Sequence, residues 1–200
     1  MTEPQKPRRP TFKDPAALEA LGEAHDPIAA LEAAHESAAV LLHAGRASND
    51  PEVTDRLVRL TDEIGLGTLA ELWASRPARS LPGALWRLYV LREWIVRNPE
   101  GVAHEYAWGV PFTEPNHVVA GAEPPGPDEV RSVADAILAG AFTGDFAVAL
   151  ERASAFCRVV VAGRAFATEG HRAALDAARL RDLADDLSAA ATLWRAGELT

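Results

Sequence analysis

The sequence predicts an all-α protein, an irregular bundle of about eight helices with no significant β-sheet. Three observations lead to this prediction. Apolar residues recur every three or four positions through most of the chain, which is the spacing of one helix face. Pairs of aspartate and proline stand where several of these patterns begin, as they do at helix starts. No stretch alternates apolar and polar residues convincingly, as a half-buried strand would.

The first two helices have clear boundaries. Asp26–Pro27 predicts the start of the first helix, and Gly45 predicts its end. Asp50–Pro51 predicts the start of the second, which is expected to run to Gly65. The second helix has a narrow apolar stripe, formed by Val53, Leu57, Leu60 and Ile64. A short helical turn is expected over 68–73.

The stretch from Leu81 to Gly109 holds three of the five tryptophans and both tyrosines. Ser80 predicts a helix start, and Asn98–Pro99 predicts a helix end. The helix between them is apolar over most of its circumference, which is typical of a central helix that is covered on several sides. A short aromatic continuation is expected over 101–109.

Residues 110–127 contain five prolines and show no helical period, so they are predicted to form a long Pro-rich loop. The helical pattern then resumes. We therefore expect a front helical half (14–109) and a back helical half (128–200) that packs on it to form one domain. Residues 1–13 are expected to be a disordered Pro- and Arg-rich leader, because EPQKPRRP has no apolar residue to bury.

One short segment resembles a known repeat. Gly144–Ala153, GDFAVALERA, resembles the start of the second helix of a tetratricopeptide unit. No second copy follows at an interval of about 34 residues, and repeat arrays need about three units to be stable. The resemblance therefore does not imply a repeat protein.

The net charge of −9 is unevenly distributed. The first thirteen residues hold four of the 20 basic residues but only one of the 29 acidic residues, so the rest of the chain is more acidic than the whole. An acidic surface repels phosphate backbones, and no basic cluster occurs outside this leader. Nucleic acid is therefore not an expected partner, and a DNA-associated regulator is disfavoured.

The single cysteine, Cys157, excludes a disulfide within the chain and a thiolate metal cluster. It falls in an apolar helical stripe, where burial makes a thiol unreactive. No apolar run reaches the about 18 residues of a membrane span, so no membrane partner is expected. These features, with the Arg- and Ala-rich composition common in GC-rich bacteria, favour a location in the bacterial cytoplasm.

Motifs for catalysis, metals or cofactors are incomplete. Glu32 and His35 have the Glu-x-x-His spacing of di-iron bundles, but there is no second copy, so His35 is expected at the edge of the core with one hydrogen-bond partner. His104–Trp108 begins like a zinc-protease helix and has tryptophan where the second histidine is required. Neither a nucleophile elbow nor a phosphate-binding loop occurs. We expect no metal and no cofactor, and the sequence favours a non-catalytic role.

The candidates for binding a ligand or partner lie between positions 81 and 109, and they are Arg92, Trp86, Trp94, His104, Glu105, Tyr106 and Trp108. Arg92 falls on the apolar face of the central helix, so it must pair with an acid or face a cavity where it could bind an anion. The ion pair is the favoured interpretation. Trp86 and Trp94 lie among charged residues, which fits either central packing or an interface.

Two functions from different classes remain open. The favoured one is a non-catalytic interaction or scaffold protein that associates with a protein partner, or with itself as a homo-oligomer, through the Trp-rich segment. The alternative is a binding protein for a small anionic ligand, or a helical enzyme, with its site between the 81–109 segment and the 110–127 loop. In that case the site would include Arg92, His104, Glu105 and Tyr106, and the loop would act as a lid.

Overall fold

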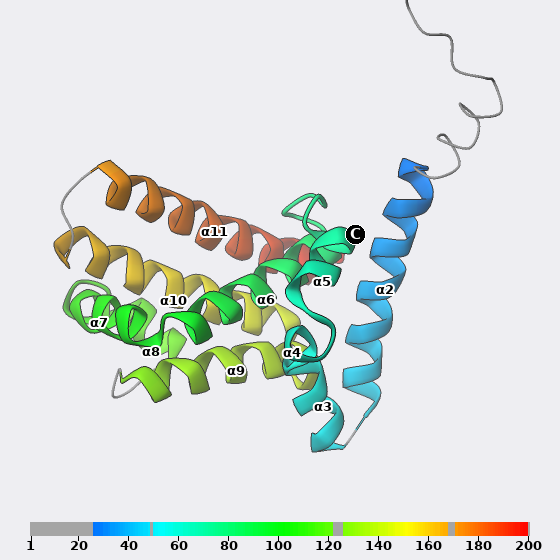
Figure 1. Cartoon of the computed structure of the whole chain (residues 1–200), viewed down its shortest axis with the longest axis horizontal. Helices are drawn as coiled ribbons and strands as arrows, with labels where there is room; N and C mark the ends of the chain where they lie inside the picture. Colours follow the sequence, from blue (N-terminus) through cyan, green and yellow to red (C-terminus); the bar gives the residue numbers. More distant parts are fainter. Residues whose placement is uncertain (1–25, 49, 122–125, 168–170, 200) are drawn as a thin grey trace, which may run out of the picture.

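A computed structural model describes residues 26–48, 50–121, 126–167 and 171–199. The fold is all-α, as predicted, and no strand occurs in these ranges (Figure 1). The elements, in chain order, are α2 (Pro27–Ala47), α3 (Pro51–Val58), α4 (Leu60–Ile64), α5 (Leu66–Trp73), α6 (Leu81–Arg97), α7 (Pro99–Gly109), the 3-10 turn η1 (Val110–Phe112), α8 (Glu114–Ala120), α9 (Pro127–Thr143), α10 (Phe146–Ala167) and α11 (His171–Ala196). The predicted leader, 1–13, lies outside the described residues.

Helix α6 occupies the centre of the bundle. It contacts α2, α5, α7, α9, α10 and α11, which explains why its sequence is apolar over most of its circumference. Figure 1 shows α2 at one side of the molecule and α7 at the opposite end, with α10 and α11 lying side by side. The largest fully buried side chains come from both halves of the chain, and they include Trp73, Tyr89, Tyr106, Phe142, Phe146 and Phe156.

The helix starts predicted at Asp26, Asp50 and Ser80 are confirmed, whereas the short helix expected from residue 68 begins earlier, at Leu66 (α5). The side chain of Asp26 accepts a hydrogen bond of 2.9 Å from the backbone N–H of Ile28, at the start of α2. Asp50 caps α3 in the same way. Ser80 accepts a bond of 3.3 Å from the N–H of Gly83 and caps α6. These bonds satisfy N–H groups that have no partner within the helix.

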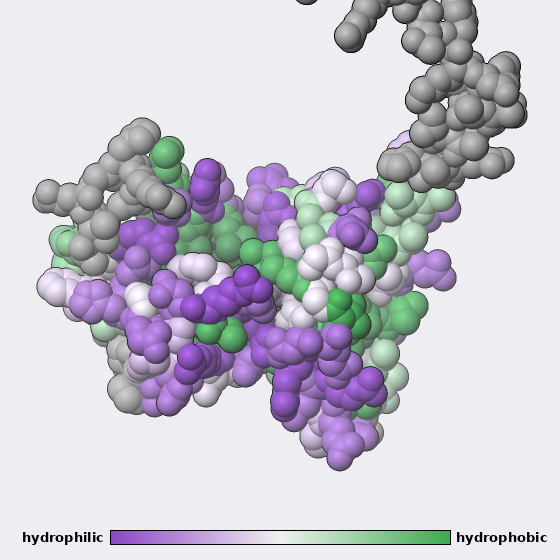
Figure 2. Space-filling view, in the orientation of Figure 1, coloured by the Kyte–Doolittle hydropathy of each residue, from purple (hydrophilic) through white to green (hydrophobic). Residues whose placement is uncertain are grey.

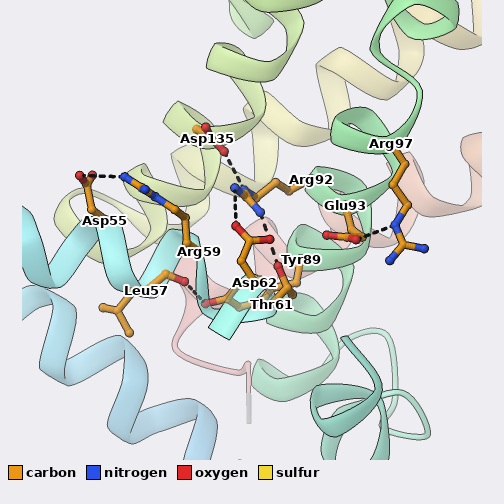
Figure 3. A network of polar contacts seen from close by, with 10 residues as sticks. All are labelled: Asp55, Leu57, Arg59, Thr61, Asp62, Tyr89, Arg92, Glu93, Arg97 and Asp135. Atoms are coloured by element: carbon orange, nitrogen blue, oxygen red, sulfur yellow. Dashed lines mark hydrogen bonds and ion pairs between the residues drawn. The ribbon is translucent and has the colours of Figure 1, made fainter. Parts of the chain in front are cut away.

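The single helix predicted over 51–64 is wrong, because the chain is divided at Arg59 into α3 and α4. In a continuous helix the carbonyl of Leu57 would accept the N–H of Thr61. Here it accepts the hydroxyl of Tyr89 at 2.6 Å, a residue of α6 (Figure 3). A contact between distant parts of the sequence thus replaces one local helical bond, and the apolar stripe ends in Ile64, which is exposed.

The long loop predicted over 110–127 is also wrong for most of its length, because η1 and α8 occupy residues 110–120. Three of the five prolines that suggested a loop lie at the beginnings of elements. Pro111 is the second residue of η1, Pro115 is the second residue of α8, and Pro127 is the first residue of α9. Proline is tolerated at these positions because the N–H of the first turn has no helical partner. Residues 122–125 lie outside the described part.

The two halves of the chain contact each other extensively. Helix α9 packs against α2, α3 and α6, and α10 packs against α7. Their buried side chains belong to one hydrophobic cluster. None of the described helices combines the length and the apolar character that crossing a membrane would require.

Candidate protein-interaction surface

Two glycines bring α7 and α10 into close contact. A β-carbon added to Gly163 would overlap the carbonyl oxygen of Glu105, and one added to Gly109 would overlap the carbonyl oxygen of Val159. Only glycine allows the two backbones to approach this closely. The crossing places the end of α7, and the η1 turn that follows it, beside the C-terminal end of α10.

Three large aromatic side chains lie exposed at this crossing. They are Trp108 on α7, Phe112 in η1 and Phe166 on α10, and we call them the aromatic cluster. Their exposed fractions are 50%, 59% and 58%, respectively. The rings of Phe112 and Phe166 are stacked with centroids 4.2 Å apart and planes 11° apart. Trp108 precedes Phe112 by four residues in a continuous helical stretch, and His104, one turn earlier, meets the Trp108 ring edge-on at 6.0 Å.

Near the cluster, Glu105 and Arg164 form an ion pair. Arg164 donates two hydrogen bonds to the carboxylate of Glu105, at 2.9 and 2.7 Å. No other Asp, Glu, Lys or Arg occurs in 101–113 or in 159–167. The guanidinium of Arg164 also lies 5.6 Å from the ring centroid of Trp94, within the range of a cation–π contact. Residues 101–113 and 159–167, which carry the cluster, therefore have no net charge, in a chain whose net charge is −9; the next acidic residue is Glu114.

Arg92 forms the ion pair that the sequence favoured. Its side chain is buried, and its Nε atom lies 2.6 Å from a carboxylate oxygen of Asp135 on α9. Its Nη2 atom lies 3.6 Å from Asp62, and its Nη1 atom lies 3.4 Å from the hydroxyl of Thr61, both on α4 (Figure 3). Every guanidinium nitrogen thus has a partner within the protein, and none is left for an anionic ligand.

The remaining candidates divide between the core and the surface. Tyr106 is fully buried and its ring stacks on Phe156 with centroids 5.0 Å apart. Trp86 and Trp94 are partly buried and pack against the core, as central packing would place them. Glu105 is engaged with Arg164. Of the residues named from the sequence, His104 and Trp108 are the two that are exposed.

Sequence reasoning missed Phe112 and Phe166. Phe112 lay in the segment that was interpreted as a loop, although its spacing of four residues from Trp108 is a helical one. Phe166 is distant in sequence, and it reaches Phe112 only because α7 and α10 cross at their glycines. Exposed apolar residues also occur on α2, where Figure 2 shows hydrophobic surface, but those on α2 are aliphatic: Ile28, Leu31 and Val40.

Cys157 and His35, the other potentially reactive side chains considered in the sequence, have structural roles. Cys157 is fully buried, and burial raises the pKa of its thiol to about 12, so the nucleophilic thiolate is disfavoured. The Nδ1 atom of His35 lies 2.9 Å from the carbonyl oxygen of Leu31, the single partner that the sequence suggested, and Glu32 is exposed. Within the described residues, no group of three or more metal-binding side chains is close enough to hold an ion.

Comparisons of the chain with protein-family models, with curated proteins and with solved structures find no match. The surface chemistry of the fold itself is therefore the basis for a functional proposal.

Proposed function

We propose that this protein is a non-catalytic, all-α interaction protein that self-associates through the aromatic cluster. The observation that carries the proposal is the exposure of Trp108, Phe112 and Phe166 at one helix crossing, each at least half exposed, with the rings of Phe112 and Phe166 stacked on each other. Aromatic side chains are enriched at protein interfaces and among the residues that dominate binding energy. A monomer gains nothing from keeping three such rings in water, whereas an interface would remove them from it.

The charge distribution supports a second copy of the chain as the partner. Two molecules that each carry a net charge of −9 repel one another over most of their surfaces. Residues 101–113 and 159–167, which carry the cluster, add no net charge to this repulsion, because Glu105 and Arg164 pair with each other. A two-fold interface brings the same residues together from both sides, and offset or edge-on aromatic rings can satisfy that geometry.

The proposed location is the bacterial cytoplasm. The Arg- and Ala-rich composition is common in GC-rich bacteria, and the cysteine is a buried free thiol, which suits a reducing compartment. The function proposed requires no cofactor.

Sedimentation equilibrium tests the proposal. We expect dimers of the wild-type protein at micromolar concentration, and we expect Trp108→Ala or Phe166→Ala to raise the dissociation constant at least about 30-fold, as for a hot spot of about 2 kcal/mol. Leu175→Ala is the control, because Leu175 is an exposed apolar residue of α11 outside the cluster. Its dissociation constant should equal that of the wild type.

Two results would contradict the proposal. One is a wild-type protein that stays monomeric at about 100 μM, a concentration at which even a weak specific dimer with a micromolar constant would form. The other is a dimer that all cluster variants leave unchanged. Circular dichroism of each variant establishes that its helical content is intact.

A further inference from the structure

A groove of about 330 Å³ lies on another part of the molecule, between α6 and α11. Its apolar lining residues are Trp86 and Val90, four residues apart on α6, Leu183 on α11, and Ala74. The indole of Trp86 has no hydrogen-bond or ring partner among the described residues, so one of the largest side chains of the protein lines the groove without a polar contact. The size is at the lower end of the range for small-molecule sites, about 300–1,000 Å³.

One ion pair forms a fixed part of the groove wall. The Nη2 atom of Arg87 lies 3.2 Å from a carboxylate oxygen of Asp186, and Nε lies 3.3 Å from the same atom. Nη1 donates to the carbonyl of Gly83 at 3.1 Å. The nitrogens of Arg87 are thus all engaged, so this pair defines the shape of the groove and contributes no net charge to a ligand.

A second pair of opposite charges in the lining is available. Arg179 and Asp182 are three residues apart on α11, which places them on neighbouring positions of one helix face. The carboxylate of Asp182 has no partner within the described ranges of the chain. Arg179 makes a single contact of 3.4 Å with Asp176, and its side chain remains 80% exposed. A carboxylate with no partner among the described residues and a largely exposed guanidinium are therefore one helical turn apart on α11, in a groove lined by four charged and four apolar residues.

We propose that this groove binds a free α-amino acid with an apolar side chain. The ligand has an ammonium and a carboxylate on one carbon atom, which matches the adjacent positions of Asp182 and Arg179. Its side chain would pack against Trp86, Val90 and Leu183. A ligand with only one charge would make one of these two charge-assisted contacts, and a purely apolar ligand would make neither. The site is separate from the aromatic cluster, so the proposal is independent of self-association.

Titration of 15N-labelled protein tests this binding through the indole N–H signals of its tryptophans. The probe is L-leucine, and Trp86→Phe identifies the Trp86 signal by its loss. We expect a saturable shift of that signal with L-leucine at up to about 10 mM, the range of a weak small-ligand site. L-Leucinamide, which lacks the carboxylate, and N-acetyl-L-leucine, which lacks the ammonium, should each bind at least about tenfold more weakly.

Exposed charges on α11 provide matched variants that leave the core intact. Asp182→Asn and Arg179→Gln should each weaken L-leucine binding about tenfold, the effect of one charge-assisted contact of about 1.4 kcal/mol. Asp185→Asn and Arg181→Gln make the same changes at residues of α11 that do not line the groove, and both should bind L-leucine like the wild type.

Several outcomes would overturn the proposal. One is the absence of any shift of the Trp86 signal. Another is equal binding of L-leucine and either singly charged analogue, which would indicate a simple cation or anion site. A third is unchanged affinity in Asp182→Asn and Arg179→Gln, which would place the ligand elsewhere.

Discussion

At the scale of single residues, Arg92 is the position where sequence and structure agree most closely. An arginine on the apolar face of a central helix needs a partner, because an unpaired buried charge is strongly destabilising. Its partners are carboxylates at the surface: the side chains of Asp135 and Asp62 are 48% and 52% exposed. Each acid keeps part of its hydration while the guanidinium is held from two helices. The result is a polar connection between α4, α6 and α9 (Figure 3).

The two carboxylates should contribute unequally to stability. We expect Asp135→Asn to lower the free energy of unfolding by about 2 kcal/mol, because its 2.6 Å contact is a charge-assisted hydrogen bond to a buried cation. Asp62→Asn should cost less than about 1 kcal/mol, because its contact is longer, at 3.6 Å. Urea denaturation measures both changes.

The control is Asp128→Asn on the same helix as Asp135. Asp128 pairs with Arg131, and its side chain is 89% exposed, so the effect should be within about 0.5 kcal/mol. Equal effects of Asp135→Asn and Asp128→Asn would show that the network around Arg92 does not stabilise the fold.

At the scale of elements, local signals predicted where helices begin, and tertiary contacts decided where they are interrupted. Asp26, Asp50 and Ser80 make their capping bonds within three residues, so the sequence alone reveals them. The division between α3 and α4 depends on the hydroxyl of Tyr89, which binds a carbonyl 32 residues earlier in the chain. The pattern of apolar residues within 51–64 therefore does not reveal the division between α3 and α4.

The candidate surface was likewise predictable only where local signals within one helix reveal it. His104 and Trp108 could be named because they share one helix with an obvious aromatic pattern. Phe166 could not be joined to them, since the contact between α7 and α10 depends on Gly109 and Gly163, whose role is invisible without the crossing itself. A glycine within a predicted helix was the one available signal, and it indicates close packing as readily as a helix end.

A glycine-to-alanine substitution, which adds one methyl group, tests how closely α7 and α10 cross. Gly163→Ala should lower the free energy of unfolding by about 1–3 kcal/mol, because its β-carbon would overlap the backbone of α7. Gly67→Ala is the matched control: Gly67 is exposed in α5, and an added β-carbon meets no atom within 4 Å. It should stabilise the protein by about 0.5–1 kcal/mol through helix propensity.

Thermal or urea unfolding distinguishes the two variants by the sign of the change. Gly163→Ala should also weaken self-association, because separating α7 from α10 would part the stacked rings of Phe112 and Phe166. Equal, small stabilisation by both substitutions would contradict the close crossing of α7 and α10.

At the scale of the whole molecule, the front and back halves of the chain are interleaved. Helix α9 of the back half contacts α2, α3 and α6 of the front half, and α7 contacts α10. Side chains of the two halves also contact each other at several places. Arg92 binds Asp135, Glu105 binds Arg164, and the guanidinium of Arg46 lies 5.1 Å from the ring centroid of Trp194. Because these contacts are distributed over the length of the bundle, neither half can lose its structure without exposing the core of the other.

We therefore expect the two halves to unfold in one cooperative transition. The variant Trp194→Phe leaves tryptophans in the front half alone, so their fluorescence reports on that half. Cys157, which is fully buried in α10, reports on the back half through its reaction with a thiol reagent during a short pulse. Both signals should have the same urea midpoint, because the two halves share one core, which is lost in a single transition. A fluorescence midpoint at lower urea than the midpoint of thiol exposure would mean that the front half unfolds alone, and that α9 and α10 keep their packing without it.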